Sequence, residues 1–205
     1  RIVNETYDTV RTHFSNKDVA SVMAARVSVP YCIAAAAVDG RLTQAQFAPA
    51  RGCRKIVIVN SHGGNVAVID IVARELRVRL GMLAVTCSWH RLGYPEGLYG
   101  ADEMRHGIHG GEVETSLMLA FRPDTVRMDK AETFTPRTVA MAREFKHLGA
   151  IQPAGFGWMA GDLHPSGAMG DASAASADKG ETSADFGARA FVELLGEVDR
   201  FSLGG

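Results

Sequence analysis

The chain has 205 residues, a mass of 22.0 kDa and a formal net charge of -1, a length that fits one domain over residues 1–205 with a sizeable core. Its 46% hydrophobic and 22% charged residues are typical of a globular protein, and the balanced charge argues against nucleic acid or an anionic membrane as a partner. The sequence shows no membrane-spanning run and no signal peptide, and three cysteines without a CxxC pair favour a reduced, cytoplasmic protein.

The first fifty residues carry weak patterns. Apolar residues at helical spacing predict a helix over residues 2–14 and another over residues 19–26. Residues 27–33 have the composition of a strand, and Pro30 favours an edge position or a strand start. Residues 34–52 predict no firm element. Because the chain begins at Arg1 rather than at methionine, we expect the natural amino terminus to lie further upstream.

The clearest stretch is a strand that runs into a glycine turn. The β-branched run over residues 56–59 predicts a parallel strand covered on both faces, and residues 66–80 predict a helix that ends at Gly81. Between them, the turn Asn60-Ser61-His62-Gly63-Gly64-Asn65 places His62 at the carboxyl end of the sheet, where open α/β sheets bind ligands. His62 is either a metal ligand or acid/base group, or a turn histidine that bonds local backbone. Asn65 is a candidate N-cap of the helix.

Further elements follow in alternation. Residues 82–89 predict a strand, and residues 90–111 a long loop of the kind that is functional or mobile. Helices are predicted over residues 114–121, 136–148 and 182–201, with a glycine-rich stretch over residues 154–170. Strands that alternate with helices predict an α/β fold, a three-layer α/β/α sandwich with a mostly parallel sheet.

A second dense cluster is His109-Gly110-Gly111-Glu112-Val113-Glu114-Thr115-Ser116. It joins a histidine, two carboxylates and two hydroxyls to the start of a helix, where the helix dipole favours negative charge. Two interpretations fit these residues. They form part of a catalytic site, or Glu112 with Thr115 or Ser116 only caps the helix.

The two clusters together resemble the creatininase family of metal-dependent amide hydrolases. Members of that family carry an Asn-Gly-His-Gly-Gly-Asn turn and a later His-Ala-Gly-x-x-Glu-Thr-Ser segment. In this chain Ser61 replaces one glycine and Gly110 replaces the alanine. The resemblance spans about residues 51–203 and includes the segments 122–124 and 166–171.

The resemblance implies a two-metal site at the carboxyl end of the sheet, with His62 as one ligand. In creatininase proper a glutamate two residues after that histidine serves the second metal, but Gly64 stands there in this chain. Glu114, which matches the family's Glu-Thr-Ser, is then the best replacement ligand. His109 matches the histidine that the family uses near the scissile bond. Glu112 either orients His109, binds substrate or lies on the surface.

The implied cofactors are two divalent ions, zinc with manganese or iron as alternatives. Such ions share a hydroxide and polarise an amide carbonyl, while a neutral imidazole passes a proton to the departing nitrogen. The resemblance therefore implies an amidohydrolase that cleaves a small amide or formamide.

One family segment does not appear in the printed sequence. The family carries Gly-Ser-x-Glu-Gln-His-Gly-x-His-Leu-Pro-x-x-Thr-Asp before the central strand, and it supplies a glutamate, a histidine and a bridging aspartate to the metals. The acidic and histidine residues upstream of His62 here stand in another order: Glu5, Asp8, His13, Asp18 and Asp39. Either the chain starts after this segment, or the printed sequence omits it, or the protein is a non-catalytic, scaffolding member that has lost its metals. We expect an omission, because the strand, turn and helix that the family has before the central strand are not clearly present over residues 27–52. Without the missing ligands, His62 and Glu114 alone would hold a metal weakly.

A second departure concerns the substrate. Where creatininase proper has a tryptophan, this chain has Glu103-Met104-Arg105-His106. Arg105 and His106 suit an anionic group such as a phosphate or carboxylate better than a flat ring, so we expect an anionic substrate, as for the family's formamide and peptide-amide hydrolases. Asn65 is a third candidate for substrate binding.

The family resemblance also implies a homo-oligomer, often a hexamer. The apolar residues of the long loop that would serve such an interface, or that would instead pack inside the subunit, are Leu92, Tyr94, Leu98 and Tyr99.

Overall fold

A computed structural model describes residues 54–204, which fall into two compact units, residues 54–88 with 202–204 and residues 89–201. Each unit is described separately. The elements predicted over residues 2–14, 19–26 and 27–33 lie outside the described residues, as do Cys32 and Cys53. That the chain forms one domain stays a prediction.

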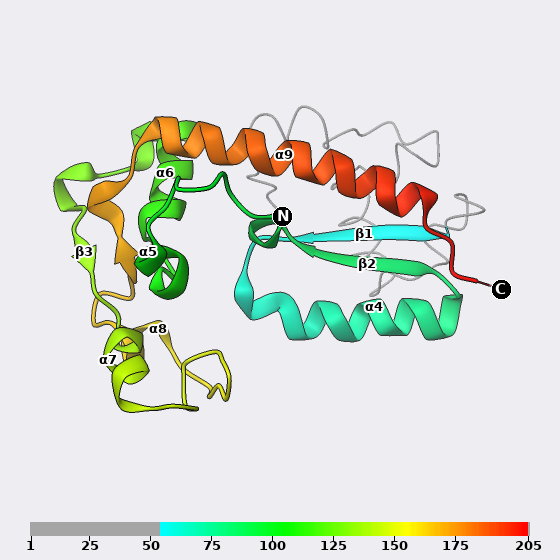
Figure 1. Ribbon diagram of the computed structural model, residues 1–205, viewed down its shortest axis with the longest axis horizontal. Helices are drawn as coiled ribbons and strands as arrows, with labels where there is room; N and C mark the ends of the chain where they lie inside the picture. The colour runs from blue at the N-terminus through cyan, green and yellow to red at the C-terminus, as the bar shows by residue number, and fades with distance from the viewer. Residues whose placement is uncertain (1–53, 205) are drawn as a thin grey trace, which may run out of the picture. The chain divides into compact units, whose positions relative to one another are not determined.

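The first unit is a strand–helix–strand unit with a parallel strand pair (Figure 1). Strand β1 (Lys55–Asn60) pairs with β2 (Leu83–Ser88) in a register that runs from Lys55 opposite Leu83 to Asn60 opposite Ser88. Helix α4 (Val66–Leu80) packs against β2. Gly81 ends α4 at φ 63°, a left-handed conformation that favours glycine, and its N–H donates to the carbonyls of Arg77 and Leu76. The three predicted elements are therefore confirmed.

Strand β1 is less buried than the sequence predicted. Residues 55–58 are half-buried and Val59 is 54% exposed. Within the described part of this unit α4 is the helix that covers the sheet, so burial on both faces is not observed there. Cys87 is buried at 5% exposure and has no disulfide, and burial raises the pKa of its thiol.

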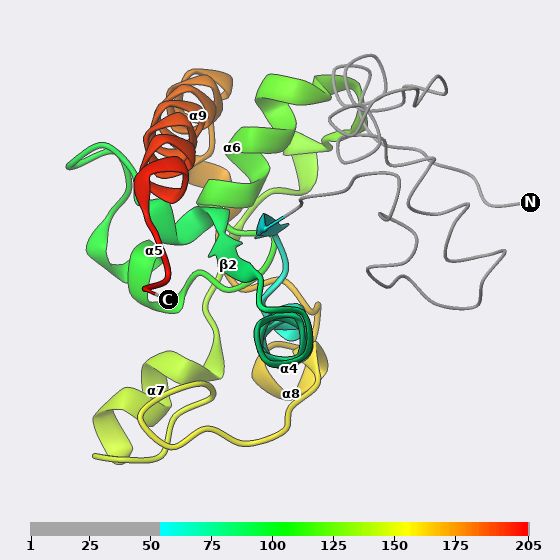
Figure 2. The ribbon, with the colours of Figure 1, turned by 90° about the vertical axis from the view of Figure 1, so that its right-hand side faces the viewer.

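The second unit is mostly helical (Figure 2). Its helices are α5 (Ala101–His106), α6 (Glu112–Phe121), α7 (Arg137–Glu144), α8 (Ala160–Leu163) and α9 (Ala177–Arg200). Strand β3 (Thr133–Phe134) pairs antiparallel with β4 (Gly170–Asp171). Helix α6 packs against α9, and Met169, Leu163 and Ala150 form a buried cluster under Trp158.

Three helix boundaries differ from the predictions by two residues or more, and one predicted loop contains a helix. Helix α6 begins at Glu112 rather than at residue 114, α7 ends at Glu144 rather than at residue 148, and α9 begins at Ala177 rather than at residue 182. The early start of α9 follows from its cap, since the Ser176 hydroxyl accepts from the Lys179 N–H. The predicted loop over residues 90–111 contains α5, a six-residue helix too short to show a periodic pattern.

Two apolar residues of that loop, Tyr94 and Tyr99, pack inside the second unit. Tyr94 makes edge-to-face contacts with Trp89 and Tyr99, at centroid distances of 6.3 Å and 5.2 Å. Tyr99 is 8% exposed, and its hydroxyl lies 2.7 Å from the Ser183 hydroxyl. These two tyrosines therefore follow the intramolecular alternative, and the oligomer stays a prediction.

The α/β class is confirmed by the parallel strand pair with helix α4 in the first unit and by the helices of the second unit, whereas the three-layer sandwich stays a prediction. Among the described residues, no helix combines the length and the apolar character needed to cross a membrane.

Candidate active site

The turn after β1 is organised by Asn60, the last residue of the strand. Asn60 is 5% exposed, and its Nδ2 donates to the His62 carbonyl at 2.9 Å and to the Ser88 hydroxyl at 3.2 Å. Its Oδ1 accepts from the His62 N–H at 3.2 Å and from Asn65 Nδ2 at 3.3 Å. One buried amide therefore fixes both ends of the turn that presents His62.

The His62 ring itself caps the short 3-10 turn over Gly63–Asn65. Its Nδ1 accepts from the Gly64 N–H at 3.1 Å. A neutral ring with Nδ1 as acceptor carries its hydrogen on Nε2. The local-backbone interpretation of His62 is thus realised in this structure, and metal binding would need Nδ1 released or the hydrogen moved between the ring nitrogens.

Asn65 occupies the predicted N-cap position of α4, but its side chain makes no capping hydrogen bond there. The side chain bonds Asn60 instead, so it supports the turn that carries His62.

In the second unit, His109 is held by backbone pairing with a buried residue. The His109 N–H donates to the Met169 carbonyl at 3.3 Å, and the Met169 N–H donates back to the His109 carbonyl at 2.7 Å. Met169 is 0% exposed. The backbone of His109 is therefore tied to the buried cluster, while its side chain stays 63% exposed.

Glu114 is the carboxylate that meets His109. Its Oε2 lies 3.4 Å from His109 Nδ1 and accepts from the Gly110 N–H at 2.7 Å. A carboxylate beside Nδ1 favours the hydrogen on that nitrogen and leaves the Nε2 lone pair directed away from the pair. The geometry is that of a histidine oriented by a carboxylate, at a distance that catalytic pairs without substrate often show.

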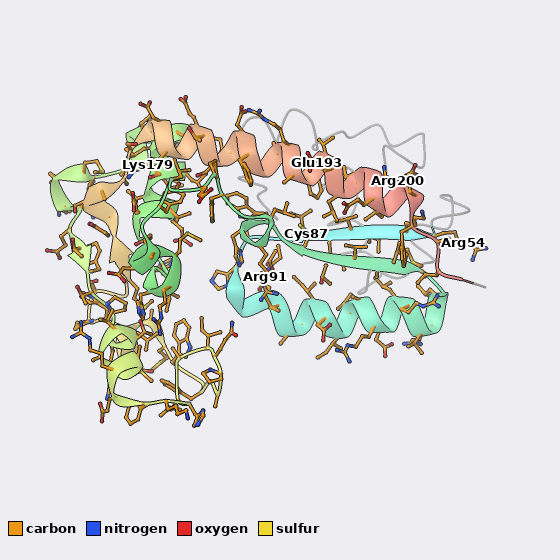
Figure 3. All side chains as sticks on the ribbon, viewed as in Figure 1. Arg54, Cys87, Arg91, Lys179, Glu193 and Arg200 are labelled. Carbon is orange, nitrogen blue, oxygen red and sulfur yellow. The ribbon has the colours of Figure 1, made fainter. Side chains whose placement is uncertain are left out.

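Glu112 points elsewhere. Its side chain is 7% exposed and forms an ion pair with Lys179 of α9, which also donates to the Ala174 carbonyl at 3.2 Å. Figure 3 shows Lys179 at the start of α9, beside α6. The structure thus brings His109 and Glu114 together and gives Glu112 a partner outside that pair.

The two hydroxyls of the second cluster do not cap α6. Ser116 is 0% exposed and accepts from the Ser176 N–H at 3.2 Å, while the Thr115 hydroxyl donates to the Gly110 carbonyl at 3.3 Å. Glu112 likewise contacts Lys179, so the capping interpretation does not describe these three side chains.

The predicted substrate residues Arg105 and His106 lie in the last turn of α5. Arg105 is exposed, whereas His106 is half-buried with Nδ1 3.0 Å from the Thr138 hydroxyl. Burial, and then the positive charge of Arg105, lower the pKa of His106, with Asp102 opposing them. At neutral pH the cation of this turn is therefore Arg105, and His106 is a neutral polar group.

Tyr94 and His90 interact electrostatically with Glu114, and neither was predicted as a site residue. Burial, followed by the charges of Tyr99, Glu114 and Glu103, raises the pKa of Tyr94 to about 12. Burial and Arg91 lower the pKa of His90, and Glu114 opposes them. Neither residue belongs to a recognisable motif, because the folded chain rather than sequence spacing brings them into the range of Glu114.

Glu103 was also not predicted as a residue of the site. Its Oε2 accepts from the Asp171 N–H at 2.9 Å and its Oε1 lies 3.4 Å from the Val113 N–H, so it joins β4 to the start of α6. No sequence pattern relates these positions, which are 68 and 10 residues from Glu103.

The described residues do not by themselves fit a two-metal centre. Within residues 54–204 no three side chains among histidine, cysteine, aspartate and glutamate are grouped so that they could hold a metal ion. Catalytic metal sites take three or more protein ligands. The predicted ligands His62 and Glu114 belong to different units, and each is engaged by a backbone N–H, of Gly64 and Gly110 respectively.

A family model and a curated relative both match this chain and point to the same family. The family model for creatininase, described as creatinine amidohydrolase, matches residues 43–195, about three quarters of the chain. A creatinine amidohydrolase from Pseudomonas putida is 33% identical over 145 residues, which are 63% of this chain and 50% of that protein. The chain thus spans about half the length of the curated relative that it matches.

Solved structures agree with this assignment. A putative creatinine amidohydrolase from Bacteroides fragilis has a TM-score of 0.59 at 20% identity over 86% of this chain and 63% of its own. At that identity the likeness concerns the fold. A tryptophan-to-phenylalanine mutant of creatininase has a TM-score of 0.50 at 27% identity over 71% of this chain and 56% of its own.

Proposed function

The chain belongs to the creatininase family, and from that premise we propose that it forms part of an amidohydrolase that cleaves a carbon–nitrogen bond of a small amide. The observation that carries the proposal is the His109–Glu114 pair, with Nδ1 and Oε2 3.4 Å apart and the carboxylate fixed by the Gly110 N–H. This pair lies in the segment that resembles the family's catalytic motif, and its histidine is open to a ligand.

His109 is proposed to move the proton. Glu114 stabilises the tautomer with the hydrogen on Nδ1, so Nε2 is free to accept a proton and then deliver it to the departing nitrogen. An amine leaves poorly as an anion, and protonation of the nitrogen removes that barrier. General acid–base groups of this kind contribute about 10²–10⁴-fold to a rate.

The substrate is proposed to be an anionic amide or formamide, closer to the substrates of the family's formamide and peptide-amide hydrolases than to creatinine. Arg105 supports this, because its guanidinium is exposed beside the neutral His106 and suits a phosphate or carboxylate. Asn65 stays a candidate for substrate binding.

The metal ions stay a prediction. Two divalent ions, zinc with manganese or iron as alternatives, would polarise the amide carbonyl and supply a hydroxide. The described residues do not complete such a centre, so the proposal for His62 and Glu114 as ligands requires further ligands from other parts of the protein. The three-layer sandwich and the homo-oligomer are proposals on the same family basis.

The test uses full-length protein reconstituted with zinc, manganese or iron and a panel of neutral and phosphorylated amides and formamides. We expect hydrolysis, with His109→Ala lowering kcat by about 10²–10⁴-fold and leaving metal content intact. The exposed His147 provides the matched control, because His147→Ala removes an imidazole from the same unit and should leave kcat unchanged.

Metal content separates the roles of the other residues. If Glu114 or His62 is a ligand, replacing it removes metal and activity together, whereas loss of activity alone makes Glu114 an orienting group. Arg105→Ala should raise KM for phosphorylated substrates and not for neutral ones. A full-length protein that hydrolyses no amide under any metal would refute the proposal and favour the non-catalytic, scaffolding alternative.

A further inference from the structure

The side chain of Glu103 reaches from α5 into a small junction between three separate segments. Its two oxygens face two backbone N–H groups, that of Asp171 in β4 at 2.9 Å and that of Val113 in α6 at 3.4 Å. A carboxylate that accepts backbone N–H groups from two segments fixes those segments relative to each other, because each bond constrains both position and direction.

Three glycines make room for this carboxylate. A Cβ added to Gly107, Gly111 or Gly170 would run into the Glu103 carboxylate, in the case of Gly170 at 2.7 Å from Oε2. A Cβ on Gly170 would also lie 2.7 Å from the Gly111 Cα, and Gly170 has φ 133°, which side chains rarely adopt. The backbone is therefore shaped around the Glu103 side chain from α5, α6 and β4 at once.

This junction involves the two segments that carry the proposed catalytic pair and the backbone partner of His109. Gly111 and Val113 stand between His109 and Glu114 in the chain, while Gly170 and Asp171 follow Met169, the residue that pairs with the His109 backbone. Through its two hydrogen bonds, Glu103 therefore links the same two segments that the His109–Met169 bridge joins. A shift at Gly111 or Asp171 would change the 3.4 Å separation of His109 and Glu114.

We propose that Glu103 is a positioning residue, which holds His109 and Glu114 in register for proton transfer without itself touching substrate. The inference rests on the proposed function, because that function gives the His109–Glu114 pair its catalytic role. Each Glu103 oxygen accepts one backbone N–H, and three glycines lie close around the carboxylate, so the observed contacts of Glu103 are with the backbone of its own unit. Displacement of a catalytic group by about 1 Å is enough to cost about 10²-fold in rate.

The test compares Glu103→Gln and Glu103→Asp with Glu96→Gln, an exposed carboxylate of the same unit. Glutamine keeps the length but turns an amide N–H₂ toward a backbone donor, and aspartate keeps the charge but is one methylene too short to reach both N–H groups. We expect both Glu103 variants to lower kcat by about 10–100-fold with little change in KM, and Glu96→Gln to change neither. Unchanged kcat in both Glu103 variants would overturn the proposal.

Combination with Glu114 distinguishes positioning from general loss of structure. If Glu103 acts through the pair, the double variant Glu103→Gln/Glu114→Gln has the kcat of Glu114→Gln alone. If the loss of kcat in the double variant equals the product of the two single losses, the proposal is overturned in favour of an independent structural role of Glu103.

A measurement on His109 without substrate tests the positioning role of Glu103 independently of the proposed function. We expect Glu103→Gln to shift the ring-nitrogen resonances of His109 in the same direction as Glu114→Gln, whereas Glu96→Gln leaves them in place. If the wild-type protein hydrolyses nothing, the proposed function fails, and the His109 resonances still decide whether Glu103 positions the pair. Unmoved resonances in Glu103→Gln would overturn the positioning role.

Discussion

The ion pair between Glu112 and Lys179 offers the strongest test of how this part of the chain is held together. Glu112 is 7% exposed and Lys179 is 33% exposed, and the pair connects α6 with the first turn of α9. The variant Lys179→Met keeps much of the side-chain length and removes the charge. It leaves the Glu112 carboxylate buried without its cation and the Ala174 carbonyl without its donor.

The expected cost follows from this burial. Breaking a buried pair by removing one partner destabilises a protein by about 3–5 kcal/mol, and the partial exposure of Lys179 places this case near the lower end, at about 3 kcal/mol. With a urea dependence of about 1–3 kcal/mol per molar, the unfolding midpoint should fall by about 1–3 M. The double variant Glu112→Gln/Lys179→Met carries no unpaired charge and should recover most of the loss.

Urea unfolding followed by tryptophan fluorescence measures this directly, because the two tryptophans of the chain, Trp89 and Trp158, both lie in the unit that contains the pair. The exposed Lys146 gives the control, since Lys146→Met should change stability by less than about 0.5 kcal/mol. A Lys179→Met protein as stable as this control, or a double variant no more stable than the single one, would refute the argument.

Three further predictions concern the same unit. Gly180→Ala should destabilise the protein by about 1–3 kcal/mol in the same urea assay, because the added Cβ would collide with the α6 backbone. Gly196→Ala in the same helix should instead stabilise the protein by about 0.4–1 kcal/mol, because the added Cβ meets only the tip of a side chain at 3.5 Å. Ultraviolet titration should show a tyrosine with a pKa of about 12, and this titration should disappear in Tyr94→Phe. Because burial raises this pKa above the unfolded value of about 10, the stability that Tyr94 contributes is complete below pH 10 and is lost as pH rises toward 12. Arg122→Ala should raise the pKa of Asp124 toward its ordinary value in a carboxyl NMR titration, because the hydrogen bond from Arg122 lowers that pKa, and a pKa that stays low would assign the shift to another group.

The region from β1 to β2 was predicted well because its determinants are local. A β-branched run, a polar glycine turn, an amphipathic helix and a glycine at C′ each specify backbone conformation within a few residues. The observed Lys55–Asn60, Val66–Leu80 and Leu83–Ser88 follow these signals closely. His62 at the end of the strand was predicted from the same pattern, although its hydrogen bond to Gly64 was one of two alternatives.

The second unit was harder because its determinants are distant in sequence. The start of α9 depends on Ser176, whose N–H donates to the Ser116 hydroxyl 60 residues away. Gly180 weakens the helical pattern there, yet it is required where α9 meets α6. The carboxylate of Glu103 is fixed by a residue 68 positions later. Such pairs leave no periodic trace, so no reading of a single sequence could find them.

The two carboxylates of the second cluster illustrate how helix geometry divides one motif into two tasks. Glu112 and Glu114 are two positions apart in the first turn of α6, which rotates them by about 200° around the helix axis. One side chain is therefore buried against Lys179, and the other, 51% exposed, faces His109. A sequence comparison that treats both as motif residues cannot separate these positions.

We therefore expect replacement of Glu112 to affect mainly stability and replacement of Glu114 to affect mainly activity. Glu112→Gln should lower the free energy of unfolding, since it leaves Lys179 without its anion, and its kcat should fall far less than that of Glu114→Gln. Glu114→Gln should leave stability within about 0.5 kcal/mol of wild type, because the side chain is half exposed, and should lower kcat strongly by removing the group that orients His109. Urea unfolding and steady-state kinetics on the same two preparations provide both quantities. If Glu112→Gln instead loses activity at unchanged stability, Glu112 acts on His109 or the substrate in the working enzyme, and the contact with Lys179 is secondary to that role.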